Sequence, residues 1–440
     1  MSTPLGDPRP LLVVVSSLSR SREYFFRSVS PHYRLWLLQG GAGRTDEVSW
    51  ELPYLVGHTV VDTLDADAMT AAVRAIPGPV AGILSYDEAR IAATAVVAER
   101  FGLPTSPPAA VLRCRDKWLT RQALAAAGVP QAASVAVASR DEAVAAAARI
   151  GYPVVLKPRN LAASFGVSRA DDEAGLLAAY ERARGVSLPE APERFEQDVL
   201  VEEFLDGPEI SVDAVVAGGL VEPLVVAHKQ TGYSPSFEET GHLVDAADPL
   251  LTDPRLAAVL TAAHAAVGYT TGTTHTELRR TAGGFKVIEI NGRLGGDMIP
   301  LLGLLAGGAD PDVVAAAVAC GQRPDTAARG AARVAGIRFY YPDEDVTVGT
   351  LELDEALLPP QAYEAVLLTG PGERVLLPPR GSAWECRLAH AIAVTETATE
   401  CRAVLDGAAK AIRLEQAAGP IPEPVTEPLV ESAIAPEQRA

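Results

Sequence analysis

The chain has 440 residues, of which 48% are hydrophobic and 21% charged, and its formal net charge is −18. This length suggests two to four packed units, and the apolar content excludes a disordered chain. A nucleic-acid surface needs clustered lysine and arginine, and the sequence has no such cluster. We therefore expect a small-molecule ligand and no nucleic-acid partner.

The sequence also predicts where in the cell the protein is located. No stretch has the roughly eighteen apolar residues that a spanning helix needs, and the start is polar and proline-bearing rather than basic and then hydrophobic. The cysteines show neither Cys-x-x-Cys nor zinc spacing: Cys114, Cys320, Cys386 and Cys401. We expect a cytoplasmic protein with reduced thiols and no membrane contact. Dimers are the commonest oligomers, so a homodimer stays open.

The first third of the chain alternates between strand and helix patterns. Residues 11–15 are all apolar and precede Ser-Ser, which is typical of a buried strand opening into a loop. The same alternation continues with strands at 34–38 and 80–84 and helices at 65–76 and 87–101. This order predicts a parallel α/β domain over residues 1–112. The first strand is not followed by Gly-x-Gly-x-x-Gly, which argues against a dinucleotide site.

The middle of the chain has a different pattern. Residues 113–329 are predicted to contain helices at 116–128 and 141–150 and strands at 154–157, 199–204, 209–216 and 220–226. Consecutive strands without helices between them indicate an α+β domain. A strand at 333–341 opens a third, carboxy-terminal α+β unit over 330–418, and the proline- and glutamate-rich residues 419–440 are expected to form a flexible tail.

A predicted β-hairpin carries the strongest chemical signal. Thr281-Ala282-Gly283-Gly284 is a turn between strands at 275–280 and 285–291. Glu289 and Asn291 share a face of one strand, and the hairpin brings Glu277 opposite them. Two close carboxylates repel unless a cation lies between them, and an all-oxygen set suits Mg²⁺. The alternative is a pair of strand carboxylates that face solvent.

Gly292-Arg293-Leu294-Gly295-Gly296-Asp297 follows the hairpin directly. Glycine lets backbone approach a ligand closely, and the guanidinium of Arg293 can bind a carboxylate or a transferring phosphoryl group at two points. A salt bridge to a nearby acid is the structural alternative. We favour the ligand role, because the glycines have no evident packing purpose.

A lysine and a small-residue loop form a second signal. Lys157-Pro158 ends a strand and precedes Ala162-Ala163-Ser164-Phe165-Gly166-Val167, whose amides could wrap phosphates while the ammonium supplies charge. The chain has five lysines against 33 arginines. A lysine at this place therefore hints that a compact ammonium is needed.

The third signal is an apolar strand that runs into a turn. The backbone along Glu202-Glu203-Phe204-Leu205 can offer carbonyl and amide groups to an adenine edge, and Glu209 can take two ribose hydroxyls. An ordinary edge strand followed by a turn explains the same residues. Taken alone, the ordinary strand is the better explanation.

Taken together in chain order, these residues resemble the ATP-grasp superfamily over about residues 80–325. The resemblance implies a fold in which two α+β subdomains clamp ATP, with a lid at about 130–205. It implies these roles: Lys117 and Lys157 on the nucleotide and its phosphates, the Ser164 loop over the β and γ groups, Glu202 and the backbone of Glu203 and Leu205 on adenine, Glu209 on ribose, Glu277, Glu289 and Asn291 on Mg²⁺, and Arg293 on the transferring phosphoryl group.

The run from Glu289 to Asp297 is most similar to carboxylate-amine ligases of the L-amino acid ligase type, and Phe237-Glu238-Glu239-Thr240-Gly241-His242 is similar to their substrate-facing stretch. The resemblance implies substrate contacts from four residues: Arg293, Gly296, His242 and Glu239. For His242, the alternative to a substrate contact is a structural role. His275 should share the face of Glu277 and is a weaker candidate.

The implied activity is an ATP-dependent ligation of a carboxylate and an amine through an acyl phosphate, with release of ADP and phosphate. Amino acids are the expected substrates and a dipeptide the expected kind of product. Purine-pathway ligases and biotin-dependent carboxylase components are alternatives. We rank a carboxylase lower because the chain has no Ala-Met-Lys-Met-like segment. A non-catalytic nucleotide-binding regulator is a further alternative, but it would not need a full metal and phosphoryl set.

Overall fold

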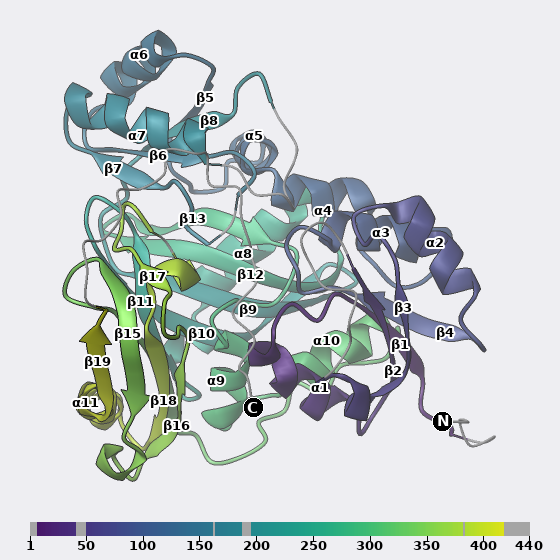
Figure 1. Cartoon of the computed structure of the whole chain (residues 1–440). Helices are drawn as coiled ribbons and strands as arrows, with labels where there is room; N and C mark the ends of the chain where they lie inside the picture. The colour runs from purple at the N-terminus through teal and green to yellow at the C-terminus, as the bar shows by residue number, and fades with distance from the viewer. Residues whose placement is uncertain (1–6, 41–49, 162, 187–194, 382, 418–440) are drawn as a thin grey trace.

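The computed structural model describes residues 7–40, 50–161, 163–186, 195–381 and 383–417. The amino-terminal part is a four-stranded parallel sheet in the order β3-β2-β1-β4 (Figure 1). Its elements are β1 (Leu11–Val15), α1 (Glu23–Val29), β2 (Arg34–Gln39), β3 (Leu55–Val60), α2 (Ala66–Arg74), β4 (Val80–Leu84) and α3 (Ile91–Arg100). Every residue of β1 is buried, so the apolar run indeed forms an internal strand. The predicted parallel α/β arrangement is confirmed.

One eight-stranded antiparallel sheet forms the centre of the molecule, in the order β13-β12-β9-β10-β11-β14-β18-β16. Its strands are β9 (Glu209–Ala217), β10 (Leu220–Gly232), β11 (Glu238–Asp245), β12 (Thr271–Thr281), β13 (Gly284–Asn291), β14 (Val334–Tyr340), β16 (Ala362–Leu367) and β18 (Ala389–Thr395). Because β11 pairs with β14, the carboxy-terminal part continues this sheet.

Helices cover both faces of the central sheet. On one face, α8 packs with the two helices that lead from the amino-terminal part, and on the other α9 and α10 pack beside α1. These helices are α4 (Pro108–Arg115), α5 (Lys117–Ala126), α8 (Pro254–Val267), α9 (Ile299–Leu305) and α10 (Pro311–Ala319). The predicted helix at 116–128 is α5, with Asp116 as its N-cap. None of the described helices is long and apolar enough to cross a membrane.

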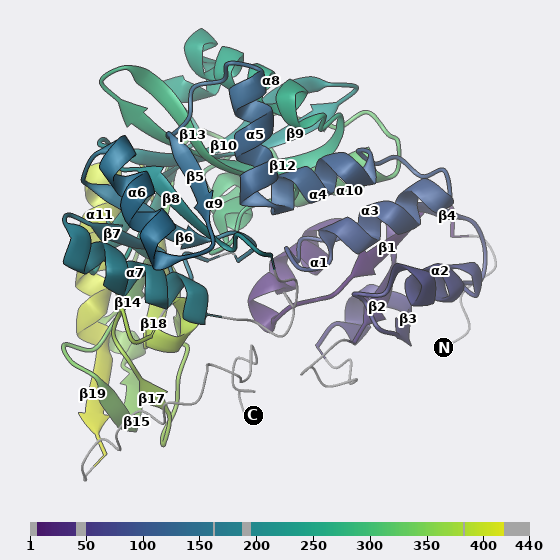
Figure 2. The ribbon, with the colours of Figure 1, turned by 90° about the horizontal axis from the view of Figure 1, so that it is seen from above.

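A smaller antiparallel sheet, β5-β8-β6-β7, occupies the segment expected to be the lid and is called the lid below. Its elements are β5 (Ser134–Val137), α6 (Arg140–Ile150), β6 (Val154–Pro158), β7 (Ser168–Ala170), α7 (Glu173–Gly185) and β8 (Val199–Glu203). Helices α6 and α7 lie on the outer face of this sheet (Figure 2). Figure 1 shows the lid above the β13 edge of the central sheet, and the connection from β8 into β9 joins the two sheets.

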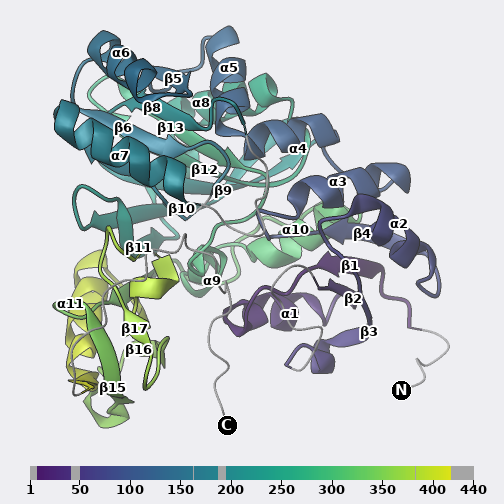
Figure 3. The ribbon, with the colours of Figure 1, turned by 45° about the horizontal axis from the view of Figure 1, so that its top comes forward.

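The carboxy-terminal part adds a helix and a small sheet to the far edge of the central sheet, on the side of the molecule away from the amino-terminal sheet (Figure 3). Helix α11 (Ala398–Ala408) packs on β14 and β18, and β17-β15-β19 form the small sheet from Arg374–Val375, Val346–Leu353 and Ile412–Gln416. Short 3-10 turns are η1 (Arg20–Arg22), η2 (Leu52–Tyr54), η3 (Pro249–Thr252), η4 (Glu355–Leu357), η5 (Ala383–Cys386) and η6 (Ala409–Ala411).

Candidate functional site

The predicted hairpin is formed by β12 and β13, and its register places Glu277 directly opposite Glu289. His275 is opposite Asn291 in the same register. Directly opposed residues of an antiparallel pair share a face, so the two carboxylates lie on one side of the sheet. A β-bulge between Glu277 and Leu278 shifts the remainder of the hairpin without changing this pairing. The arrangement predicted from the sequence is therefore present.

Lys117, the first residue of α5, reaches this hairpin. Its Nζ lies 3.0 Å from Oε1 of Glu289 and also donates to the carbonyl oxygen of Leu161 in the loop after β6. With its amide nitrogen turned toward the acceptors, Asn291 donates to Glu289 Oε1 at 3.0 Å. Lys117 thus connects the hairpin carboxylate to the loop that contains Ser164.

Lys157 lies in a second buried ion-pair group. Its Nζ is 2.8 Å from Oε2 of Glu202, and Arg121 binds both oxygens of the same carboxylate at 2.7 and 2.9 Å. Burial lowers the pKa of Lys157. Burial alone would raise the pKa of Glu202, but Arg121 and Lys157 together hold it at about 2. The Glu202 carboxylate is therefore occupied by two cations, and the adenine contact expected of Glu202 stays a prediction.

Lys229 on β10 is the central cation of the site. Its Nζ lies 2.8 Å from Glu239, 3.1 Å from Glu277 and 3.2 Å from Glu209, measured to Oε1 in each case. Although burial opposes its charge, the three carboxylates raise the pKa of Lys229 well above its usual value. The ammonium links the expected ribose, substrate and metal residues into one cluster.

His275 occupies the same face as Glu277, as expected. Its Nδ1 is 2.6 Å from Oδ1 of Asp213 and its Nε2 is 3.5 Å from Glu277. Burial disfavours the imidazolium, yet its hydrogen bonds to Asp213 and Glu277 raise the pKa of His275 to about 9. Asp213 also accepts from the amide of Gly295 at 3.1 Å. This histidine carries a positive charge and helps to fix the glycine loop after the hairpin.

Arg293 forms a salt bridge with an acidic residue, which is the structural alternative considered for it in the sequence analysis. Its Nε lies 2.8 Å from Oε2 of Glu88, and its Nη1 donates to the carbonyl of Leu294 at 2.8 Å. Glu88 follows β4, at the carboxyl edge of the parallel sheet. That edge is where open α/β sheets usually bind ligands, so the position of Glu88 directly after a strand is a signal for it, although Glu88 belongs to none of the motifs. A Cβ atom on Gly296 would meet open space.

The expected substrate contacts form a compact triangle with Asp297. His242 Nε2 lies 3.2 Å from Glu239 Oε2 and 3.2 Å from Asp297 Oδ2, and its ring is fully buried. Burial works against protonation, but the two carboxylates raise the pKa of His242. Arg387, from the carboxy-terminal part, binds both oxygens of Asp297 at 2.9 and 3.2 Å. The structure thus brings His242 and Glu239 together. Lys229 binds Glu239 on one side of this triangle, and Arg387 binds Asp297 on the other.

The remaining predicted residues lie in the lid and in the connection from β8 to β9. Ala163 and Ser164 have positive φ angles of 54° and 56° in the loop after β6, while Ala162 is outside the described residues. Glu203 turns its side chain to Lys286, with Nζ–Oε distances of 3.0 and 3.1 Å, and Leu205 is buried. The side chain of Glu203 is therefore engaged by Lys286, and a nucleotide contact through its backbone stays a prediction.

Glu209 has two cationic partners. Its Oε2 lies 2.8 Å from Nη2 of Arg279, and its other oxygen, Oε1, contacts Lys229. Neither Arg279 nor Lys229 belonged to the sequence motifs. Four further members of the site were missed for the same reason: Glu88, Arg121, Asp213 and Arg387.

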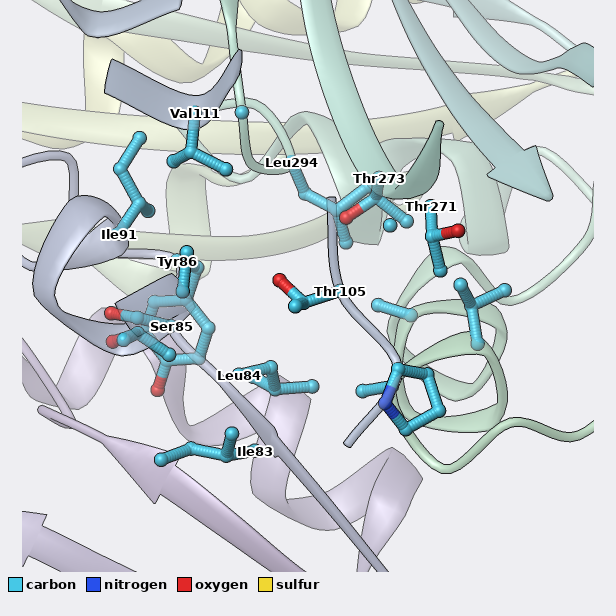
Figure 4. A pocket seen from close by; sticks show the side chains of 18 of the residues that line it. Ile83, Leu84, Ser85, Tyr86, Ile91, Thr105, Val111, Thr271, Thr273 and Leu294 are labelled. Atoms are coloured by element: carbon cyan, nitrogen blue, oxygen red, sulfur yellow. The ribbon is translucent and has the colours of Figure 1, made fainter. Parts of the chain in front are cut away.

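A pocket lies at the open end of the hairpin, between the carboxyl end of β4 and the start of β12 (Figure 4). Leu84 and Tyr86 form one wall, Thr271 and Thr273 the other, and Leu294 closes it next to the glycine loop. None of the described residues that line it has a charged side chain. Mg²⁺ takes carboxylate oxygens, and phosphate charge is favoured by lysine and arginine, so the charged cluster at the hairpin is the better candidate for nucleotide chemistry.

Comparison with known proteins gives consistent results. Residues 150–300 match the family model described as ATP-grasp domain. The chain is 29% identical over 366 residues to the Sinorhizobium fredii protein named "Uncharacterized protein y4rH", covering 80% of this chain and 72% of the relative. It is also 29% identical over 330 residues to alanine–anticapsin ligase of Bacillus subtilis, covering 67% of this chain and 64% of the relative. The chain thus spans just under two thirds of that ligase.

Among solved structures, the fold is similar to that of an L-amino acid ligase from Bacillus licheniformis. The TM-score is 0.75 at 20% sequence identity, and the match covers 94% of this chain and 100% of the other. The predicted fold class is confirmed by this likeness together with the observed sheets.

Proposed function

We propose, from the premise that this chain carries an ATP-grasp domain on an ATP-grasp fold, that it is an ATP-dependent ligase joining a carboxylate to an amine. One observation carries the proposal. The opposed carboxylates Glu277 and Glu289 are surrounded by the ammonium groups of Lys117 and Lys229 and followed by Arg293. This set of charges suits a triphosphate, a divalent cation and a transferring phosphoryl group at one place.

Glu277, Glu289 and Asn291 would hold Mg²⁺, because they are hard oxygen donors on one sheet face. The ion would neutralise phosphate charge. The carboxylates now bind lysine ammonium groups at 3.0 and 3.1 Å. When Mg-ATP binds, phosphate oxygens would take these lysines as partners while the carboxylates turn to the metal. Each lysine would then exchange a carboxylate partner for a phosphate oxygen.

Lys157 and the Ser164 loop would hold the phosphates from the lid side. Lys157 is fixed by the Glu202 carboxylate at 2.8 Å, so its ammonium needs little reorganisation. Glu209 would take the ribose, and the backbone of Glu203 and Leu205 would read adenine. Closure of the lid over the phosphates would exclude the water that hydrolyses an acyl phosphate.

The reaction has two steps. A carboxylate oxygen attacks the γ-phosphorus of ATP, the bond to the β–γ bridging oxygen breaks, and ADP leaves. The amine then attacks the carbonyl carbon of the acyl phosphate, the carbon–oxygen bond breaks, and inorganic phosphate leaves as the nitrogen loses a proton. Arg293 can hold two oxygens of the developing acyl phosphate once it leaves Glu88.

Amino acids are the proposed carboxylate and amine. The names of the relatives support this choice, since one acts on alanine and another is an L-amino acid ligase. The carboxylates of Glu239 and Asp297 have cationic partners in Lys229, His242 and Arg387, but both remain partly exposed and would offer acceptor oxygens to the ammonium group of an amino acid. A cytoplasmic location and a homodimer remain predictions.

The test is a panel of L-amino acid pairs incubated with Mg-ATP, with ADP and phosphate both measured. Hydroxylamine replaces the amine in a second series, because an acyl phosphate reacts with it to give a hydroxamate. We expect at least one amino acid to give hydroxamate and ADP in equal amounts. Carboxylate-dependent ADP without any trappable acyl group, and with a stable phosphorylated product, would instead make the protein a kinase.

A further inference from the structure

Arg387 reaches the candidate substrate side of the site from the carboxy-terminal part of the chain. It lies between η5 and β18, and its side chain is 8% exposed. Both terminal nitrogens bind Asp297, at 2.9 and 3.2 Å. Its guanidinium also stacks on the ring of Phe339 on β14, with 3.6 Å between Cζ and the ring centroid. Such a stacked and forked guanidinium has one available orientation.

The same guanidinium binds the strand on the other side of the substrate triangle. Its Nη2 donates to the carbonyl oxygen of Glu239 at 3.1 Å, and its Nε donates to Oε1 of Glu238 at 3.3 Å. Arg387 therefore holds the glycine loop, through Asp297, and the start of β11, through Glu239, at one fixed separation.

The clamped residues need this support. Asp297 and Met298 have positive φ angles of 46° and 58°, a conformation that costs free energy for residues other than glycine. Tyr341 adds a hydrogen bond to the carbonyl of Glu239 at 3.1 Å and one to Glu238 Oε1 at 2.9 Å. Strand β11 is thus held by side chains of the carboxy-terminal part as well as by pairing with β14.

The turn η5 also touches the phosphate side of the site. The backbone amide of Ala383 donates to Oε2 of Glu238 at 3.0 Å, and its methyl group packs with Leu161 and Phe165 of the loop after β6. One short turn of the carboxy-terminal part thus contacts both the loop expected at the phosphates and the strand expected at the substrate.

We propose that Arg387 is a positioning residue for the substrate: it sets the distance between Asp297 on the glycine loop and Glu239 on β11, and so the shape of the site around His242 and Gly296. Its role is to hold the groups that bind an amino acid, and it acts through them. Its kinetic test rests on the proposed ligase function, whereas its structural test does not.

The test compares Arg387→Gln and Arg387→Lys with Arg413→Gln. Arg413 belongs to the same part of the chain and pairs with Asp354 at 2.8 Å, with 61% of its side chain exposed. The measurements are amide hydrogen exchange, the affinity for Mg-ADP, and kcat and KM with the amino acid that gives most phosphate release. Glutamine removes the guanidinium group and its charge. Lysine keeps the charge, but its single ammonium cannot bind Asp297 and Glu239 together.

In Arg387→Gln we expect amide exchange to rise at least tenfold in residues 237–243 and 293–299, and KM for the amino acid to rise at least tenfold. Mg-ADP affinity should stay within twofold, and kcat should fall less than KM rises. Arg387→Lys should fold as the parent does, with KM raised at least threefold. Arg413→Gln should match the parent in every measurement.

Unchanged exchange in both segments of Arg387→Gln, or an unchanged KM, would overturn the proposal. So would an equal loss of Mg-ADP affinity, because that is the result of general destabilisation. If Arg387→Gln does not fold, Arg387→Lys decides, and a parental KM in that variant would overturn the proposal. If the parent protein turns over no amino acid, the ligase function fails, and hydrogen exchange alone still decides whether Arg387 positions the two segments.

Discussion

The Nζ of Lys229 lies 3.1 Å from Oε1 of Glu277 on one buried face of the central sheet. This ammonium also binds Glu209 and Glu239, and only 1% of its side chain is exposed. Three carboxylates can share the face because one cation stands between them. Removal of that cation takes one partner from each of the three carboxylates and leaves Glu209 with Arg279, Glu239 with His242 and Glu277 with His275.

Lys229→Met should therefore lower the free energy of unfolding by about 3–5 kcal/mol, the usual cost of breaking a buried ion pair. Urea denaturation measures the loss. Lys286→Met is the matched control, since its pair with Glu203 is partly exposed and should contribute less than about 1 kcal/mol. Equal effects of the two substitutions would contradict the central position given to Lys229.

Glu289→Ala should reduce turnover by about a hundredfold or more while the fold remains intact, because a metal ligand and part of the charge stabilisation are lost. Lys157→Ala should act similarly through the phosphates. Glu352→Ala, which changes an exposed strand glutamate, is the control. Near-normal turnover of Glu289→Ala at low Mg²⁺ would remove this residue from the metal site.

Arg293→Lys should lower hydroxamate formation by about tenfold or more, whereas ATP affinity should change much less, because lysine cannot provide the two-point contact to a developing acyl phosphate. Single-turnover hydroxamate assays and nucleotide titration separate the two effects. Glu88→Gln removes the charge of the carboxylate that Arg293 and the Asn291 amide now contact, but it keeps both proposed ligand groups, so it should leave the chemical step less affected. A parallel loss of ATP affinity and chemistry in Arg293→Lys would assign Arg293 to ground-state binding.

His264 gives the fold a defined pH dependence. Its Nδ1 donates to the carbonyl of Leu260 at 2.7 Å, and its Nε2 is 2.8 Å from the hydroxyl of Thr274. Burial lowers the pKa of His264 to about 4. Because the folded pKa is below the ordinary value, the stabilising effect is fully present above about pH 6.5 and is lost as the pH falls toward 4.

The loss over this pH window should reach about 3 kcal/mol at its acidic end. Unfolding free energies of the parent and His264→Gln, measured in urea between pH 7 and 4, isolate the contribution from that of the carboxylates. The parent should lose more stability than the variant. Identical pH dependence in the two proteins would show that His264 titrates normally.

Local sequence patterns were sufficient for the hairpin but not for the partners around it. The turn Thr281–Gly284 and the two-residue spacing of Glu289 and Asn291 determine which side chains share a face. Lys229 gave no such signal, because its three partners lie on three other strands, β9, β11 and β12. Its role depends on the register between strands, which no local pattern encodes.

Other differences have similar physical causes. Helix α7 was not predicted, because the hydrophobic positions in its sequence are interrupted by charged residues and small side chains. Strand β11 was interpreted only as a substrate-facing stretch, yet it joins the carboxy-terminal part to the central sheet. Arg387 lies 90 residues beyond Asp297, so its contact follows from sheet order rather than from any motif.

The most direct test of the central claim uses the accepted amino acid with both carboxylate oxygens replaced by ¹⁸O. An acyl phosphate forms when one of these oxygens bonds to the γ-phosphorus, and that oxygen leaves with the phosphate when the amine attacks. The account predicts one ¹⁸O in each inorganic phosphate and none in ADP or AMP, as measured by mass spectrometry. Phosphate without ¹⁸O, or label in AMP, would contradict the acyl-phosphate ligase proposed for this chain.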